Sequence, residues 1–442
     1  MIKKIQLEVT VFILLLISVL FTNNIDVGIY KYFSQLNYGK EANNLKAFFV
    51  NITELGDSLW YFLILISIFL TCFLANKIKL ISTKKYSYLK NFSIFGFIYL
   101  LSTGVVTQLI KHLIGRARPN HINVDEVVFF NFFTTDSVLH SFPSGHTSTI
   151  IAVTFVLCLA LPSLKFFLFI SGSIIAISRI VVGAHYFTDV IAGALIAIIV
   201  YKLIKIFYAA KFPNISFNDF EIQPISTLVK IQIVFIIIAI FITIGSGLDI
   251  YLSNFFYYGD NQFMLQSYYI TSIIFRKILL PFLLIYIFFL PTISRFALIK
   301  KIFFNYVFSL REIVFIWISG LTTIVLFINI LLKDKWGRAR PNDLINFGGE
   351  SSFTPWYRFG DSCASNCSFV SGDSSVGFLL IVFYFITKKN IYCYLALFFG
   401  TTLGFIRIIA GGHFFSDIVF AQLVTTVSIS TFYILYTKAY AK

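Results

Sequence analysis

Long apolar blocks, separated by short polar segments, run along almost the whole chain. A helix crosses the hydrocarbon core of a bilayer with about 20 apolar residues, and most blocks come close to that length. The first block follows Met-Ile-Lys-Lys, but no small-residue cleavage site ends it, so we count it as a helix rather than a signal peptide. The pattern predicts an all-α integral membrane protein with twelve spans, at 6–22, 58–76, 91–110, 144–161, 166–183, 187–207, 229–246, 277–293, 312–332, 371–387, 391–409 and 414–436.

The composition supports the same class of protein. Hydrophobic residues make up 58% and charged residues 12% of the 442 positions, against about 45–50% and about 25% in soluble domains. Phenylalanine alone occurs 54 times. A soluble globule of this size cannot bury so much apolar surface, and a disordered chain has the opposite composition. A soluble protein, a disordered chain and a disulfide scaffold are therefore excluded.

The basic residues of short loops fall on one side of the predicted membrane. Segments 77–90 and 295–311 carry most of them, and both termini are predicted on the same side. Lysine and arginine in short loops mark the cytoplasmic side. The segments 111–142 and 333–370 then face the opposite, periplasmic side. Much of the formal charge of +15 reflects topology and lipid headgroups, so no nucleic-acid partner is expected.

The chain repeats itself. The sequence KHLIGRARPN (111–120) returns as KDKWGRARPN (333–342), and DVGIYKYF (26–33) loosely matches DIYLSNFF (249–256). Arg179, His185 and Asp189 return as Arg407, His413 and Asp417. The repeat predicts two six-helix domains in parallel orientation, 1–210 and 225–442, joined by a polar linker at 211–224.

Charged residues next to membrane spans are costly and therefore informative. In the first half they fall at span ends that the topology places at one membrane face. Three cations suit the oxygens of a phosphoryl group, and a glycine at a helix start lets backbone N–H groups approach the same oxygens. These residues are Lys111, Arg118, Gly145, His146, Arg179, His185 and Asp189.

The two histidines suit different steps of a phosphoryl transfer. Asp189 follows His185 by four residues, a spacing that lets its carboxylate accept the imidazole Nδ1–H and leaves Nε2 as a nucleophile. His146 would protonate the leaving oxygen. This chemistry requires no metal and no cofactor, and the sequence has no cluster with metal-ligand spacing.

These residues form a three-part pattern, Lys111-x6-Arg118-Pro119, Pro143-Ser144-Gly145-His146 and Ser178-Arg179-x5-His185-x3-Asp189. The pattern resembles the signature of the type 2 phosphatidic acid phosphatase (PAP2) superfamily. The resemblance implies a phosphohistidine intermediate, with His185 as nucleophile, Asp189 as its orienting group and His146 as general acid. It further implies that Lys111, Arg118, Ser144, Gly145 and Arg179 bind the substrate phosphate.

The second half matches the pattern with one departure. Lys333, Arg340, Ser371, Gly372 and Arg407 fall on the phosphate-binding positions, and His413 and Asp417 fall on the nucleophile pair. Asp373 replaces the general-acid histidine. A working second site with Asp373 as acid and a degenerate site both remain open, and we take the working site as the prediction. Phe347-Gly348-Gly349-Glu350, Phe353-Thr354-Pro355-Trp356 and the segment NCSFVSGD (366–373) resemble the lipid A phosphatase branch of the family.

Other polar residues carry simpler interpretations. Arg116 and Arg338 are each predicted to anchor lipid headgroups, and His112, His121 and His140 to be loop or interfacial histidines. Cys363 and Cys367 share a loop on the predicted periplasmic side, where either a disulfide or two free thiols would fit. The other three cysteines, Cys72, Cys158 and Cys393, lie inside predicted spans and are expected to be apolar fillers.

The sequence thus predicts a metal-independent lipid phosphatase of the bacterial inner membrane, with periplasmic active sites and no obligate protein partner. The favoured substrate is lipid A, at its 1- or 4'-phosphate. The alternatives are undecaprenyl diphosphate, phosphatidylglycerol phosphate and phosphatidic acid. A transporter with a 6+6 repeat is a different class, but its polar residues would lie near the midplane. In a third interpretation the second half only binds lipid and delivers it to the first.

Overall fold

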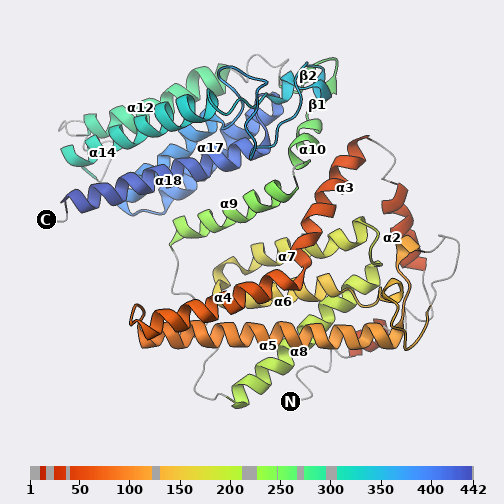
Figure 1. Cartoon of the computed structure of the whole chain (residues 1–442). Helices are drawn as coiled ribbons and strands as arrows, with labels where there is room; N and C mark the ends of the chain where they lie inside the picture. Colours follow the sequence, from red (N-terminus) through yellow and green to blue (C-terminus); the bar gives the residue numbers. More distant parts are fainter. Residues whose placement is uncertain are drawn as a thin grey trace. The chain divides into compact units, whose positions relative to one another are not determined.

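The computed structural model describes residues 10–15, 24–35, 40–121, 130–211, 226–245, 247–265, 273–294 and 306–440. The chain divides into two compact units, Met1–Pro224 and Ile225–Lys442, which we describe one at a time (Figure 1). Most of the predicted linker, from residue 212 on, lies outside the described residues, as does most of the predicted span 6–22.

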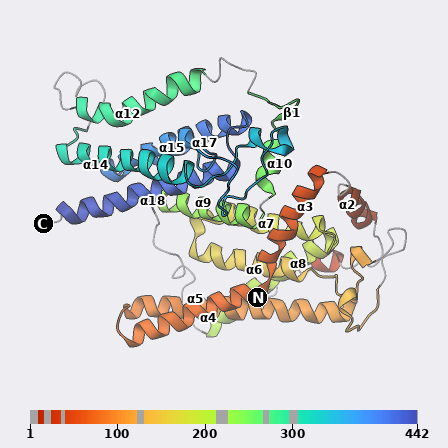
Figure 2. The same ribbon diagram turned by 45° about the horizontal axis from the view of Figure 1, so that its top comes forward.

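The described part of the first unit consists mainly of helices joined by loops and 3-10 turns. Helices α4 and α5 run side by side, and α6 packs against α5, α7 and α8 (Figure 2). Its helices are α2 (Asn24–Gln35), α3 (Lys40–Ile52), α4 (Ser58–Lys77), α5 (Thr83–Ile114), α6 (Gly145–Ala160), α7 (Lys165–Val181) and α8 (Phe187–Lys211), with 3-10 turns at Thr53–Gly56, Pro119–His121, Ser137–Leu139 and Pro162–Leu164.

The second unit repeats this order with more irregular backbone. A π-helical segment, Ile273–Leu279, leads into α12, and a second one, Thr322–Lys333, extends α14. Its elements are α9 (Thr227–Ile244), α10 (Leu248–Asn254), the hairpin β1 (Tyr257–Gly259) and β2 (Gln262–Phe263), α12 (Leu280–Ile293), α14 (Leu310–Leu321), the 3-10 turns Pro341–Asp343, Ile345–Phe347 and Leu379–Ile381, α15 (Gly372–Phe378), α16 (Val382–Thr387), α17 (Ile391–Ile409) and α18 (Phe415–Tyr440).

The apolar helices agree with the predicted spans wherever the structure describes them. Among the residues that the structure describes, nine helices are long and apolar enough to cross a membrane, and two more, Gly145–Ala160 and Gly372–Thr387, are shorter. Together they match every predicted span except 6–22, so the total of twelve stays a prediction. The protein is a multi-pass membrane protein. The hydrophobic pattern gave no elements between residues 23 and 57, where α2, α3 and a 3-10 turn form.

Serine caps set the helix starts that matter for the site. The Ser144 hydroxyl accepts a hydrogen bond from the Thr147 N–H at the start of α6, and the Ser371 hydroxyl accepts one from the Ser374 N–H at the start of α15. Helix α5 ends at Gly115, whose φ of 57° is left-handed. A side chain at Gly115 would also collide with the Asn131 carbonyl.

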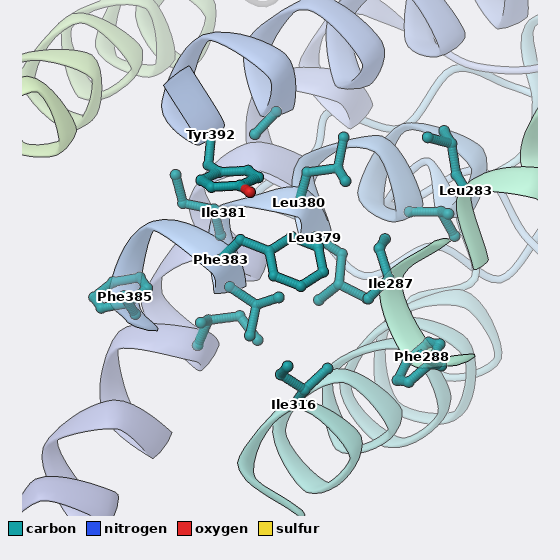
Figure 3. Close-up of a cluster of buried hydrophobic side chains, with 14 of the residues drawn as sticks. Leu283, Ile287, Phe288, Ile316, Leu379, Leu380, Ile381, Phe383, Phe385 and Tyr392 are labelled. Atoms are coloured by element: carbon teal, nitrogen blue, oxygen red, sulfur yellow. The ribbon is translucent and has the colours of Figure 1, made fainter. Parts of the chain in front are cut away.

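The apolar core of the second unit packs between its membrane helices (Figure 3). Ile287 and Phe288 of α12, Ile316 of α14, and Leu379 and Phe383 in the run that continues α15 are all buried there. This cluster contains no charged side chain. The ionisable residues described next gather instead at helix ends.

Candidate active site

The histidine on the predicted nucleophile position lies between α7 and α8. The His185 side chain is 2% exposed, and its Nδ1 is 3.6 Å from Oδ2 of Asp189 in the first turn of α8. Burial lowers the pKa of His185 to about 3, against the opposing effect of Asp189. The imidazole is therefore neutral at neutral pH, with Nε2 free of a proton when Nδ1–H faces the carboxylate.

Asp189 is fixed by several donors. The Ser141 hydroxyl donates to it over 2.6 Å and the Tyr186 backbone N–H over 2.9 Å. Nη1 of Arg116 donates over 2.5 Å. The carboxylate has no solvent-exposed surface, so it is a charged group whose orientation is set by the protein.

Arg116 is not the headgroup anchor that the sequence suggested. Its side chain is fully buried, pairs with Asp189, and makes a second ion pair of 2.7 Å with Asp26 in α2. Its guanidinium also lies 4.1 Å from the ring centre of Tyr186. Burial lowers the pKa of Arg116, but the two carboxylates outweigh burial and leave it above its usual value. A buried guanidinium needs such partners, because desolvation would otherwise be prohibitive.

Asp26, Arg116, Asp189 and His185 form a buried cluster that we call the frame. The second unit contains the same frame. Arg338, predicted as an anchor, is also fully buried and pairs with Asp249 over 2.8 Å and with Asp417 over 2.7 Å. His413 Nδ1 is 3.4 Å from Asp417 Oδ2, and burial lowers its pKa to about 4. The Ser368 hydroxyl and the Phe414 N–H donate to Asp417, as Ser141 and Tyr186 donate to Asp189.

Four of these residues were not singled out in the sequence: Asp26, Ser141, Asp249 and Ser368. The signal for the two aspartates was present, because Asp26 and Asp249 begin the loosely matching segments 26–33 and 249–256. We attached no chemistry to that match. The serines carried a signal too, because Ser141 and Ser368 begin the matching segments SFPSG (141–145) and SFVSG (368–372).

The predicted phosphate-binding cations of the first unit lie together. Lys111 is buried, and its Nζ donates to the His140 carbonyl over 2.5 Å. Arg179 donates to Thr53 Oγ1 over 2.8 Å. The charges of Lys111, Arg118 and Arg179 act on one another. Within the described part of the chain, Nε of Arg118 and Nε of Arg179 are buried donors without an acceptor, a state that a bound anion would relieve.

His146, on the predicted general-acid position, begins a groove. Ser144 and Gly145 precede it at the start of α6, and Gly145 lies against the Lys111 side chain. The groove has a volume of about 700 Å³, and its polar end is formed by His146 and Asp57. One wall of the groove is apolar and consists of Phe62, Leu100, Leu101, Val105 and Leu109 of α4 and α5. Gln108, His112, Ser148 and Thr149 add polar groups to the lining.

The second unit differs at the equivalent positions. Asp373 lies 3.2 Å from Nε of Arg276 and 3.6 Å from Nε of Arg407, so the predicted acid is an acceptor in two ion pairs. Asn366 accepts from Arg340 through its carbonyl oxygen over 2.7 Å and through Oδ1 over 3.0 Å, and Lys333 donates to Oδ1 over 3.3 Å.

The remaining sequence-predicted residues are placed as follows. Cys363 and Cys367 form a disulfide that closes the loop containing Asn366. His140 is buried beside the site, and its ring packs against His112 at 4.4 Å between centres. The side chain of His121 lies outside the described residues. Cys72 and Cys393 are buried free thiols and Cys158 is half-buried.

Comparison with known proteins finds lipid A phosphatases among the relatives of this chain. The chain is 40% identical over 114 residues to the lipid A 4'-phosphatase of Francisella tularensis subsp. novicida. The aligned region covers 25% of this chain and 51% of that protein. The chain is also 34% identical over 148 residues to the lipid A 1-phosphatase of Rhizobium etli, where the aligned region covers 32% and 62%. The chain thus spans less than two thirds of either relative.

A solved PAP2 type phosphatidylglycerolphosphate phosphatase from Bacillus subtilis aligns with 46% of this chain and 96% of its own, at 23% identity and a TM-score of 0.33. The PAP2 superfamily model matches residues 92–213 and again residues 314–441, together more than half of the sequence. Each match contains one buried Arg–Asp–His frame. The chain therefore belongs to the PAP2 superfamily, and the family domain occurs in it twice.

Proposed function

We propose that this protein is a membrane lipid phosphatase that releases phosphate from lipid A through a phosphohistidine intermediate, with its first half as the principal site. The observation that carries the proposal is the surrounding of His185. The imidazole of His185 is neutral and buried, and it faces the fixed carboxylate of Asp189. The same site contains three cations, and two of them have donors without an acceptor.

The first chemical step is an attack by Nε2 of His185 on phosphorus. Asp189 accepts the Nδ1–H and stabilises the positive charge that develops on the ring. Lys111, Arg118 and Arg179 bind the non-bridging oxygens and offset their charge in the transition state. His146 protonates the leaving oxygen, so the lipid departs as an alcohol. His146 then takes a proton from water as the water attacks the phosphohistidine and releases phosphate.

The groove next to His146 supports a lipid substrate. His146 is one of the residues that line it, and its apolar wall belongs to membrane helices α4 and α5. A headgroup phosphate bound among the cations would leave the acyl chains along this apolar wall. Active sites at the periplasmic face follow from the distribution of lysines and arginines in the loops.

The relatives favour lipid A among the substrates. Proteins similar to this chain remove the 1-phosphate and the 4'-phosphate of lipid A, as their names state. Two family domains in one chain would suit a lipid with two phosphates. Undecaprenyl diphosphate, phosphatidylglycerol phosphate and phosphatidic acid remain the alternative substrates.

The test is phosphate release in detergent with EDTA present, comparing lipid A with the three alternative lipids. It is run on the wild type, His185→Ala, His413→Ala and the double variant, with Ser171→Ala on α7 as a control. We expect lipid A to be hydrolysed fastest and the double variant to be inactive. Release that persists in the double variant would overturn the phosphohistidine mechanism. Insensitivity to vanadate would favour a transporter instead.

A further inference from the structure

The two halves differ at one pair of positions next to the reacting histidine. The separation of 223 residues between Asp26 and Asp249 also relates Thr53 to Arg276. Thr53 lies just before α4 and accepts a hydrogen bond from Arg179, whereas Arg276 lies just before α12 and pairs with Asp373. The first half therefore has Thr53 with His146, and the second half has Arg276 with Asp373.

This exchange removes the proton donor of the site and puts an ion pair in its place. Aspartate in place of histidine brings a negative charge, and arginine in place of threonine brings a positive one. Asp373 is held between Arg276 and Arg407 as an ion-pair acceptor. A carboxylate in that position cannot supply the proton that an alkoxide leaving group needs. It can accept a proton from water.

We infer that the second half hydrolyses phosphoanhydrides of lipids, whose leaving group departs without a proton, and that Arg276 binds that leaving group. This inference rests on the proposed phosphatase function and names the substrate class of the second site. A lipid diphosphate has such a leaving group, because the lipid monophosphate departs as a weakly basic anion. A cation stabilises that departing charge directly.

The steps balance without further reagents. Nε2 of His413 forms a bond to the terminal phosphorus while the bridging P–O bond breaks, and the lipid monophosphate leaves as an anion paired with Arg276. Water then attacks the phosphohistidine, Asp373 takes its proton, and the N–P bond breaks to release inorganic phosphate. Asp373 returns the proton to solvent. The incoming terminal phosphoryl group replaces the Asn366 oxygens on Lys333 and Arg340.

The position of Arg276 fits a ligand for the leaving group. Its side chain is 52% exposed, whereas the side chain of Arg407 is 12% exposed and that of His413 only 1%. Arg407 lies against Gly412, next to His413, where a Cβ would collide with the guanidinium. Arg407 thus belongs to the terminal phosphoryl group, and Arg276 lies farther out, on the side where the rest of the lipid leaves.

The test compares farnesyl diphosphate with farnesyl monophosphate, which share one chain and differ in the leaving group. Phosphate release is measured on the full-length protein carrying His185→Ala, so that only the second half turns over. We expect hydrolysis of the diphosphate and little of the monophosphate. Radiolabel from the terminal phosphate should be trapped on His413. Equal loss of both activities in His185→Ala, with the wild type active, would overturn this inference alone. A wild type that releases no phosphate from any lipid would overturn the proposed function.

Arg276 is tested in the same background. Arg276→Thr, which introduces the residue of the first half, should lower diphosphate hydrolysis by about 100-fold, as loss of a charge-stabilising donor does elsewhere. Arg276→Lys keeps a cation and should restore most of the rate. Arg358→Thr removes an exposed arginine of the same half and serves as the control. Unchanged hydrolysis in Arg276→Thr would exclude a role in leaving-group binding. Asp373→His combined with Arg276→Thr recreates the pair of the first half and should give hydrolysis of the monophosphate.

Discussion

The two halves share the buried frame behind the nucleophile, but they differ at the opposite side of the site, which we call its mouth. Behind the nucleophile, Asp26–Arg116–Asp189 and Asp249–Arg338–Asp417 have the same ion pairs and nearly the same distances. At the mouth, Thr53 and His146 are replaced by Arg276 and Asp373. Buried charges constrain each other, since removing one leaves the others unpaired in a low-dielectric interior. At the mouth of the second half, the side chains of Arg276 and Asp373 are 52% and 19% exposed. Charges that keep some contact with water can change in compensating pairs, and the chemistry changes with them.

The largest expected effect comes from breaking the frame. Arg116→Leu leaves Asp26 and Asp189 buried without their cation, which we expect to cost about 3–5 kcal/mol of folding stability. Arg338→Leu should cost a similar amount in the second half. Thermal unfolding in detergent measures both, with Arg358→Leu at an exposed position as the control. If Arg116→Leu unfolds like the wild type, Arg116 is not a structural centre of the site.

The next largest effect distinguishes the mouth of the first half, with its proposed general acid, from the mouth of the second half. His146→Ala removes the proposed general acid and should lower phosphate release from a lipid monophosphate by about 10²–10⁴-fold. The loss should fall mainly on kcat, because the three phosphate-binding cations remain. A substrate with an aryl phosphate leaving group, which needs no proton, should be affected far less. An equal loss on alkyl and aryl substrates would mean that His146 acts in binding or folding.

Acid sensitivity follows from the buried histidine. The pKa of His185 falls to about 3 in the folded protein, against about 6.5 in an unfolded chain. As pH falls, the unfolded state binds the proton first. The free energy of unfolding is therefore unaffected by the titration of His185 above pH 6.5 and decreases progressively toward pH 3. Wild type should lose up to about 1.4 kcal/mol per pH unit relative to His185→Gln below pH 6.5. Parallel stability curves for the two proteins between pH 7 and 4 would contradict this.

The sequence predicted the His–Asp pairs because their spacing within one helix turn is local. It predicted the cation sets from the topology of the span ends, from the repeat and from the family resemblance. It could not predict the role of Arg116. An arginine after a membrane span has the same local pattern whether it anchors headgroups or enters the core, and its partners Asp26 and Asp189 are 90 and 73 residues away. The pairing of Asp373 with Arg276 was hidden for the same reason. Only the exact repeat GRAR in both halves indicated that this arginine is more than an anchor.

The smallest effect tests whether the two frames are equivalent. Ser141→Ala removes one hydrogen bond to Asp189 but leaves those from Arg116 and Tyr186, so kcat for a lipid monophosphate should fall about tenfold, or about 1.4 kcal/mol. KM should change little, because the serine donates to the carboxylate and not to the phosphate-binding side chains. Ser368→Ala in the His185→Ala background should lower diphosphate hydrolysis by the same factor, since Ser368 donates to Asp417 in the same way. Losses that differ by more than tenfold would show that the frames have diverged along with the mouths.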